Sequence, residues 1–77
     1  ITVLTGVIMP QKIKYSKHSR EKMIERGISE YEVEEGIRKG AKRLQYPDKI
    51  LSEYRYYTVV YKKIEDVIFV ITVKPRW

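Results

Sequence analysis

The segment from His18 to Arg26, HSREKMIER, places the only histidine of this 77-residue chain among several basic side chains. On a helix, Lys22 and Arg26 follow His18 by one and two turns, so imidazole, ammonium and guanidinium groups share one exposed stripe. Metal-free cleavage of RNA needs an acid or base and cations that stabilise the phosphorane. His18 and Arg26 are therefore candidate catalytic residues, and Lys22 is a candidate phosphate ligand.

Further candidate RNA ligands lie outside this stripe. Arg20 falls on the apolar side of the helix, four residues before Ile24, and is expected either to extend its charged end past the helix edge or to line a groove toward the sheet. The C-terminal half supplies cations for the RNA backbone and aromatic rings for stacking on bases. The phosphate ligands expected there are Arg55, Lys62, Lys74 and Arg76, and the stacking candidates are Tyr54, Tyr56 and Tyr61.

Ordinary structural roles for the same residues stay open. His18 is equally compatible with a solvated surface position, Lys22 and Arg26 with helix ion pairs, and the tyrosines with packing between strands. A single histidine cannot perform both proton transfers of RNA cleavage, so a second group would have to come from a tyrosine or lysine of the sheet.

Composition narrows the classes of partner and site. The net charge of +6 and the pI near 9.6 favour an anionic partner, RNA first among them. One histidine and no cysteine disfavour a metalloenzyme, so no metal or cofactor is expected. No apolar run is long enough to span a bilayer, and a cytoplasmic location without a membrane partner is expected. The high charge content and lack of Asn are typical of thermophilic proteins.

Two helices are expected near the start of the domain. Ser16 can cap a helix over residues 17–26, and Gly27 can end it in the left-handed conformation. Ser29 and Glu32 form a capping box, which predicts a second helix that begins at Glu30 and ends near Gly40. The short connection makes the pair an αα-hairpin.

The remainder of the chain has the composition of strands. Residues 54–63 and 67–74 predict an antiparallel hairpin, residues 41–46 a third strand, and residues 1–9 or 12–15 a fourth. The expected fold class is α+β, with two N-terminal helices packed on a small antiparallel sheet of three to four strands. Residues 10–77 are expected to form one domain, preceded by an extension of uncertain role over residues 1–9.

The segment YSKHSREKMIERGISEYEVEEGI resembles a family of small prokaryotic domains of unknown function. That family has a His-Ala-x-x-Arg-Met-x-x-Arg-Gly-Ile-Ser motif, then an acidic helix and a strand hairpin, and the similarity covers roughly residues 15–74. His18 takes the position of the family histidine, Lys22 that of the first arginine and Arg26 that of the second. Lys22 keeps the charge and loses the bidentate fork of arginine.

The resemblance implies a RelE/barnase-like fold, because the family is grouped with barnase, EndoU, colicin and RelE proteins. It implies a metal-independent endoribonuclease-like toxin of a toxin–antitoxin pair, which attacks through the 2′-hydroxyl and is covered by a small antitoxin protein. The alternative is a catalytically silent RNA-binding or protein-interaction module of the same fold. Whether the chain is an enzyme stays open at this stage, as does a homodimer through an edge strand.

Overall fold

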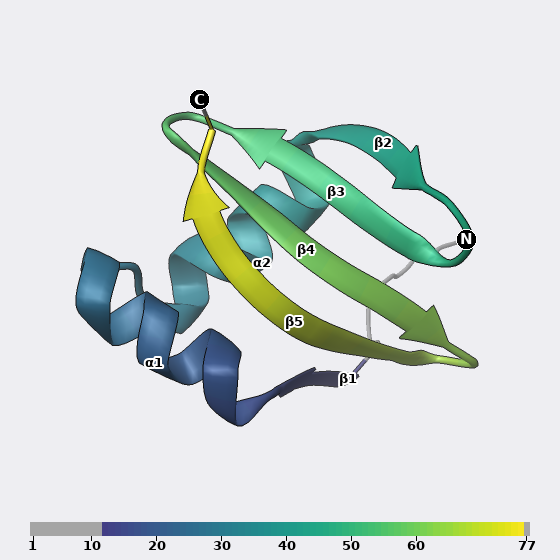
Figure 1. Ribbon diagram of the computed structural model, residues 1–77, viewed down its shortest axis with the longest axis horizontal. Coiled ribbons are helices and arrows are strands. Elements are labelled where there is room, and N and C mark those ends of the chain that lie inside the picture. Colours follow the sequence, from purple (N-terminus) through teal and green to yellow (C-terminus); the bar gives the residue numbers. More distant parts are fainter. Residues whose placement is uncertain (1–11, 77) are drawn as a thin grey trace, which may run out of the picture.

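Two helices and five strands form an α+β fold in the computed structural model, which describes residues 12–76 (Figure 1). The segment 1–9, which was expected to be an extension or a strand, lies outside the described residues. The elements follow one another as β1 (Lys12–Tyr15), α1 (Lys17–Arg26), α2 (Glu30–Lys39), β2 (Ala41–Gln45), β3 (Lys49–Tyr54), β4 (Tyr57–Ile64) and β5 (Val67–Pro75).

Both predicted helices are confirmed, and their caps explain where they begin and end. The hydroxyl of Ser16 accepts a hydrogen bond from the Ser19 amide at 3.0 Å, and Gly27 ends α1 at a φ of 68°. Ser29 and Glu32 form the expected capping box at the start of α2. Because these signals lie within a few residues of each helix end, the local sequence is sufficient to place them.

The predicted arrangement of helices and sheet was wrong. The helices do not lead the domain, because β1 precedes them, and the sheet has five strands in the order β1-β5-β4-β3-β2. It is mixed rather than antiparallel, since β1 pairs with β5 in parallel. A parallel pair needs a long crossover connection, and here everything from α1 to β4 lies between the two strands.

The predicted strand over residues 54–63 was also wrong, because a turn at Arg55 and Tyr56 divides it. The first part belongs to β3, which pairs with β4 across this turn, with Tyr54 opposite Tyr57. Arg55 has a φ of 55°, a conformation usually signalled by glycine or asparagine. The hairpin of β4 and β5 was predicted correctly.

Both helices pack on one face of the sheet. α1 contacts β5, and α2 contacts β3 and β4; in Figure 1, α2 lies behind the sheet. The hydroxyl of Tyr57 donates to the carbonyl of Glu32 at 2.7 Å and ties β4 to α2. The core between these layers consists of Met23, Ile28, Val33, Ile37, Tyr57, Val59, Tyr61, Ile68, Val70 and Val73.

The opposite face of the sheet has no helix from residues 12–76 packed on it, and we call it the open face. Side chains alternate between the two faces along a strand, so the neighbours of the core residues lie on the open face. No helix within residues 12–76 is long and apolar enough to cross a membrane. The charged residues that the strand registers place on the open face are Lys12, Lys14, Arg43, Lys49, Glu53, Lys62 and Lys74.

Candidate nucleic-acid interface

Three lysines and a phenylalanine form a continuous row across the open face. Lys14 of β1 lies opposite Phe69 of β5, Phe69 lies opposite Lys62 of β4, and Lys62 lies opposite Lys49 of β3. Neighbouring strands are about 4.8 Å apart, so the row spans about 14 Å. We call these four residues the lysine row. It places a partly exposed aromatic ring between ammonium groups.

The lysine row is electrostatically unfavourable in the isolated protein. Lys49 and Lys62 are directly opposite each other, and like charges in such pairs are destabilising. Asp48 relieves part of the repulsion, because its carboxylate lies 3.4 Å from the Lys62 ammonium. The one acidic residue that the registers place on the open face, Glu53, is paired with Arg43 at 2.9 Å. The face therefore has surplus positive charge that an anionic ligand would neutralise.

A second basic cluster lies where the turn between β3 and β4 meets the end of β5. Arg26 and Tyr56 line a shallow cavity of about 250 Å³ there. The Arg76 guanidinium donates to the carbonyl of Arg55 at 3.2 Å, and its amide donates to the carbonyl of Tyr56. Within residues 12–76, the three arginines form no ion pair. We call Arg26, Arg55, Arg76 and Tyr56 the arginine end.

His18 is exposed in the first turn of α1, apart from the arginine end. Eight residues of helix separate it from Arg26, which is about 12 Å along the axis. Among residues 12–76 its imidazole has no hydrogen-bond or ion-pair partner. Lys22, between them on the predicted stripe, is paired with Glu25 at 3.2 Å. Within residues 12–76, no hydrogen bond or ion pair therefore links His18 to a second proton-transfer group.

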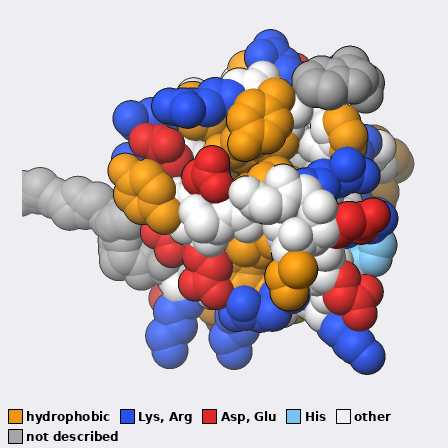
Figure 2. Space-filling model, turned by 90° about the vertical axis from the view of Figure 1, so that its left-hand side faces the viewer, with side chains coloured by type: hydrophobic (Ala, Val, Ile, Leu, Met, Phe, Trp, Pro, Cys, Tyr) orange, Lys and Arg blue, Asp and Glu red, His pale blue; other side chains and the backbone are white. Residues whose placement is uncertain are grey.

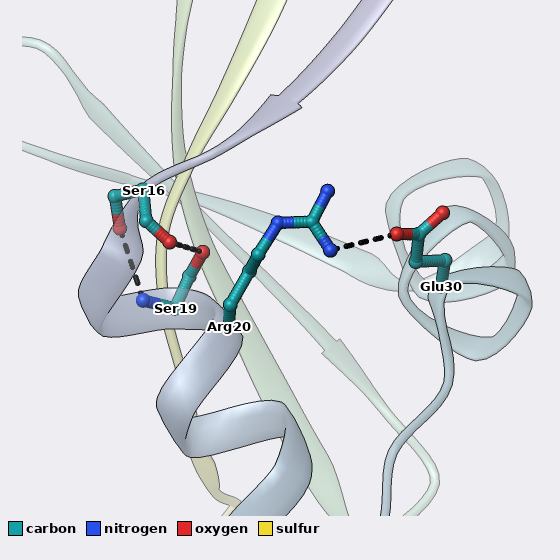
Figure 3. A network of polar contacts seen from close by, with 4 residues as sticks. All are labelled: Ser16, Ser19, Arg20 and Glu30. Atoms are coloured by element: carbon teal, nitrogen blue, oxygen red, sulfur yellow. Dashed lines mark hydrogen bonds and ion pairs between the residues drawn. The ribbon is translucent and has the colours of Figure 1, made fainter.

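Arg20, which was predicted to lie outside the stripe of His18, Lys22 and Arg26, points across to α2 (Figure 3). Its guanidinium lies 2.9 Å from the Glu30 carboxylate and 4.8 Å from the centre of the Tyr15 ring. The pocket that Arg20 lines is formed by α1, the connection and Glu30, rather than by strands of the sheet. Arg20 thus joins the two helices and the first strand, away from the open face.

The surface seen from the α1–α2 connection differs from the open face (Figure 2). Acidic and basic side chains are mixed there, and hydrophobic side chains lie exposed between them. On the helices, Ile24 and Tyr31 are 82% and 67% exposed. Acidic residues thus accompany the basic ones at this end of the molecule, whereas the strand registers place mainly basic residues on the open face.

The three candidate stacking tyrosines occupy different environments. Tyr61 is only 5% exposed and lies in the core under the helices, where burial raises its pKa. Tyr54 is half-buried, and its ring stands edge-on to Tyr57 at 6.1 Å. Tyr56 is 48% exposed at the arginine end. Only Tyr56 among them offers an exposed ring for a base to stack on.

The predicted site residues therefore do not form one cluster. Lys62 and Lys74 lie on the open face, Arg26, Arg55 and Arg76 form the arginine end, and His18 stands apart. Within residues 12–76, no group of three or more histidine, aspartate or glutamate side chains is arranged to hold a metal.

Sequence reasoning missed three members of the lysine row: Lys14, Lys49 and Phe69. The alternation of lysine with apolar residues in KIKY was a usable signal, because it predicts a strand with one basic face. Lys49 gave no such signal, since β3 was not predicted. Phe69 lies in the predicted strand over residues 67–74, which is apolar at both sets of alternating positions, so the pattern did not show that its face has no helix of residues 12–76 packed on it.

Comparisons with known proteins define the family of this chain. No curated protein and no solved structure matches it. Nothing in these comparisons groups it with RelE or barnase proteins. The model of one family, described as a domain of unknown function (DUF4258), matches residues 15–74. This range contains both helices and, of the lysine row, every residue except Lys14, and the chain belongs to the DUF4258 family.

Proposed function

We propose that this domain binds single-stranded RNA on its open face. The lysine row is the observation that carries the proposal. Phe69 offers a ring on which a base can stack, and the lysines on either side of it are positioned for the flanking phosphates. Sheets that present aromatic rings among basic residues recognise unstacked bases in this way. The repulsion between Lys49 and Lys62 would be relieved on binding.

The arginine end extends the proposed interface. Guanidinium groups match phosphate oxygens bidentately, and those of Arg26, Arg55 and Arg76 have no carboxylate partner within residues 12–76. The exposed ring of Tyr56 gives a second stacking position. We therefore expect the bound strand to contact both the sheet and the end of α1.

Substitution of Phe69 by leucine tests the stacking part of this proposal. Leucine keeps the apolar bulk that packs on the strand and removes the aromatic plane. Base–aromatic stacking contributes about 1–3 kcal/mol, so we expect affinity for a labelled single-stranded RNA to fall about tenfold in fluorescence anisotropy. Tyr31→Leu, on the exposed surface of α2, serves as the control. Equal RNA affinity of Phe69→Leu and the unmodified protein would contradict the proposal.

An endoribonuclease-like toxin is a second candidate function, favoured by the exposure of His18. His18 has no hydrogen-bond or ion-pair partner among the described residues, so its ring nitrogens are accessible to a 2′-hydroxyl or a leaving 5′-oxygen. Lys22, one turn after His18, would stabilise phosphorane charge, and Arg26, a further turn along the helix, would hold a neighbouring phosphate. If the protein is a toxin, a small acidic antitoxin that covers the basic open face would prevent RNA from binding.

Cleavage of end-labelled RNA in EDTA distinguishes the enzyme from a silent binding module. The toxin reading predicts fragments with 2′,3′-cyclic phosphate ends from the unmodified protein and none from His18→Ala, with RNA binding retained by both. It also predicts growth arrest on expression without an antitoxin. If both proteins bind RNA and neither cleaves it, the domain is an RNA-binding module alone.

A further inference from the structure

A cavity of about 450 Å³ lies on the helix side of the sheet, between α2 and the strands. Its size is typical of pockets for small molecules. The apolar part of the lining consists of three isoleucines and a tyrosine, and the remainder consists of charged side chains and a second tyrosine. The apolar lining residues are Ile13, Ile37, Tyr61 and Ile68, and the polar ones are Tyr15, Glu30, Glu34, Arg38, Lys42 and Lys63.

Charge in this cavity is separated into an acidic and a basic end. Glu30, Glu34 and Arg38 occupy successive turns of α2, so about 12 Å of helix axis separates the first from the last. Lys42 adds to the basic end, where its ammonium donates to the carbonyl of Gly40 at 2.9 Å. Lys63 reaches the cavity from β4.

The charged groups of the cavity are incompletely paired. Glu30 has Arg20 as its partner, but within residues 12–76 Glu34, Arg38 and Lys63 form no ion pair. Glu34 and Arg38 are exposed on the same side of α2. Among the described residues, the cavity therefore has one unpaired carboxylate, Glu34, and two unpaired cations, Arg38 on α2 and Lys63 on β4.

The Tyr15 hydroxyl is the clearest sign of a missing ligand group. Among the described residues it is the one buried side-chain polar atom without a hydrogen-bond partner. Burial raises the pKa of Tyr15 to about 12, and the carboxylates of Glu30 and Glu34 act in the same direction. The hydroxyl therefore stays protonated and is a donor. Leaving a buried donor unpaired costs free energy that a ligand acceptor would recover.

We infer that this cavity binds a nucleoside monophosphate whose base carries an exocyclic amino group. The phosphate would lie near Arg38 and Lys42 where α2 ends, with Lys63 of β4 as a further cation of the cavity, and the sugar and base would cover the apolar lining. Toward the start of α2, Glu34 accepts from the amino group and Tyr15 donates to a base acceptor. The inference does not rest on RNA binding by the open face, because the cavity lies on the other side of the sheet.

The preference among bases follows from this arrangement. Cytosine and adenine present an amino donor where uracil presents a carbonyl oxygen. The carboxylate of Glu34 would accept a hydrogen bond from the amino group of cytosine or adenine and would repel the carbonyl oxygen of uracil. Adenosine and cytidine monophosphates should therefore bind more tightly than uridine monophosphate.

Titration of the full chain with nucleotides, followed by amide chemical shifts, tests the inference. We expect AMP and CMP to saturate with a dissociation constant of about 1 mM or tighter, and UMP to bind at least about fivefold more weakly. Shifts should concentrate at Tyr15, Glu34 and Lys63. Equal affinities for AMP and UMP, or inorganic phosphate binding as tightly as AMP, would overturn the inference.

Variants of the cavity provide the second arm. Tyr15→Phe should lower AMP affinity about fivefold to tenfold without lowering the melting temperature, because the hydroxyl has no partner in the free protein. Arg38→Gln should lower AMP affinity to a similar degree, because it removes a cation that would bind the phosphate. Glu21→Gln, on exposed α1 outside the cavity, is the control. Unchanged AMP affinity of Tyr15→Phe would contradict the inference, whatever the RNA affinity of the protein.

The two proposals fail separately. Lys49→Gln on the open face should weaken RNA binding and leave AMP affinity unchanged, whereas Arg38→Gln should weaken AMP binding and largely retain affinity for long RNA. If Lys49→Gln lowers AMP affinity as much as Arg38→Gln does, nucleotides bind the open face and the cavity assignment is wrong.

Discussion

Val59 and Val60 are neighbours in β4, and both are almost fully buried, yet they belong to opposite faces of the sheet. Val59 lies under the helices, in a core closed by α2 and Tyr57. Val60 lies on the open face, in a row with Leu51 of β3 and Thr72 of β5. A low exposed fraction therefore does not by itself distinguish the packed core from the open face. The difference is that α1 and α2 cover the side of Val59, whereas no helix of residues 12–76 covers the side of Val60.

The largest expected effect comes from a substitution that separates α2 from the sheet. A Cβ on Gly40 would lie 2.6 Å from the carbonyl oxygen of Gly36 and 2.8 Å from that of Glu53, and it would also meet the Ser52 hydroxyl. Backbone atoms on two elements would have to move, so Gly40→Ala should lower the free energy of unfolding by about 3 kcal/mol or more. Urea denaturation measures this.

The neighbouring position supplies the control for that substitution. Ala41 is exposed, so Ala41→Ser should change the free energy of unfolding by less than about 0.5 kcal/mol. If Gly40→Ala were as stable as Ala41→Ser, the close approach of α2 to β3 would be wrong.

A pair of valine truncations measures the difference between the two faces directly. Val59→Ala leaves a cavity between rigid layers and should cost about 2–3 kcal/mol of unfolding free energy. Val60→Ala should cost about 1 kcal/mol, because flexible lysine side chains of the open face can move into the space. Thermal or urea unfolding of the two variants gives both values. Equal losses of unfolding free energy in the two variants would mean that side chains on the open face are packed as tightly as those under the helices.

A smaller effect is expected at alkaline pH. Burial raises the pKa of Tyr57 to about 12, with Glu32 and Glu35 adding to the shift, and burial likewise raises that of Tyr15 to about 12. A pKa above the unfolded value of about 10 means that the folded state holds its proton more tightly. Stability is thus fully present below about pH 10 and declines as the pH rises toward 12.

Tyr57→Phe checks this pH dependence. The variant loses the hydrogen bond to the Glu32 carbonyl and is less stable at neutral pH, but its stability should decline less between pH 10 and 12. Circular dichroism melts across that range give the comparison. A decline identical to that of the unmodified protein would contradict the role of Tyr57.

The sequence predicted what depends on neighbouring residues and missed what depends on distant ones. Ser16, Gly27 and the Ser29–Glu32 capping box specify both helices locally. The parallel pairing of β1 with β5 joins residues more than fifty positions apart, and no local pattern encodes it. The turn at Arg55 lacks the glycine or asparagine that usually marks a left-handed conformation.

The same limit applies to the candidate site. Lys62 and Lys74 were predicted as candidate RNA ligands from the basic and aromatic composition of the C-terminal half, and the strand registers place both on the open face. The row that joins Lys14, Phe69 and Lys49 to Lys62 depends on the registers of four strands. Spacing on α1 identified His18 and Arg26, but it could not show that Arg20 would pair with Glu30.

The salt dependence of RNA binding tests the central claim most directly. Lys14→Gln with Lys49→Gln removes two charges from the open face, and Arg38→Gln with Lys63→Gln removes two from the helix side; none of the four forms an ion pair within residues 12–76. If RNA lies on the open face, the first double variant loses affinity and its log–log salt slope becomes shallower by about 1.4, while the second keeps a slope near that of the unmodified protein. Equal losses in both variants would show that RNA responds only to net charge and would contradict a specific open-face site.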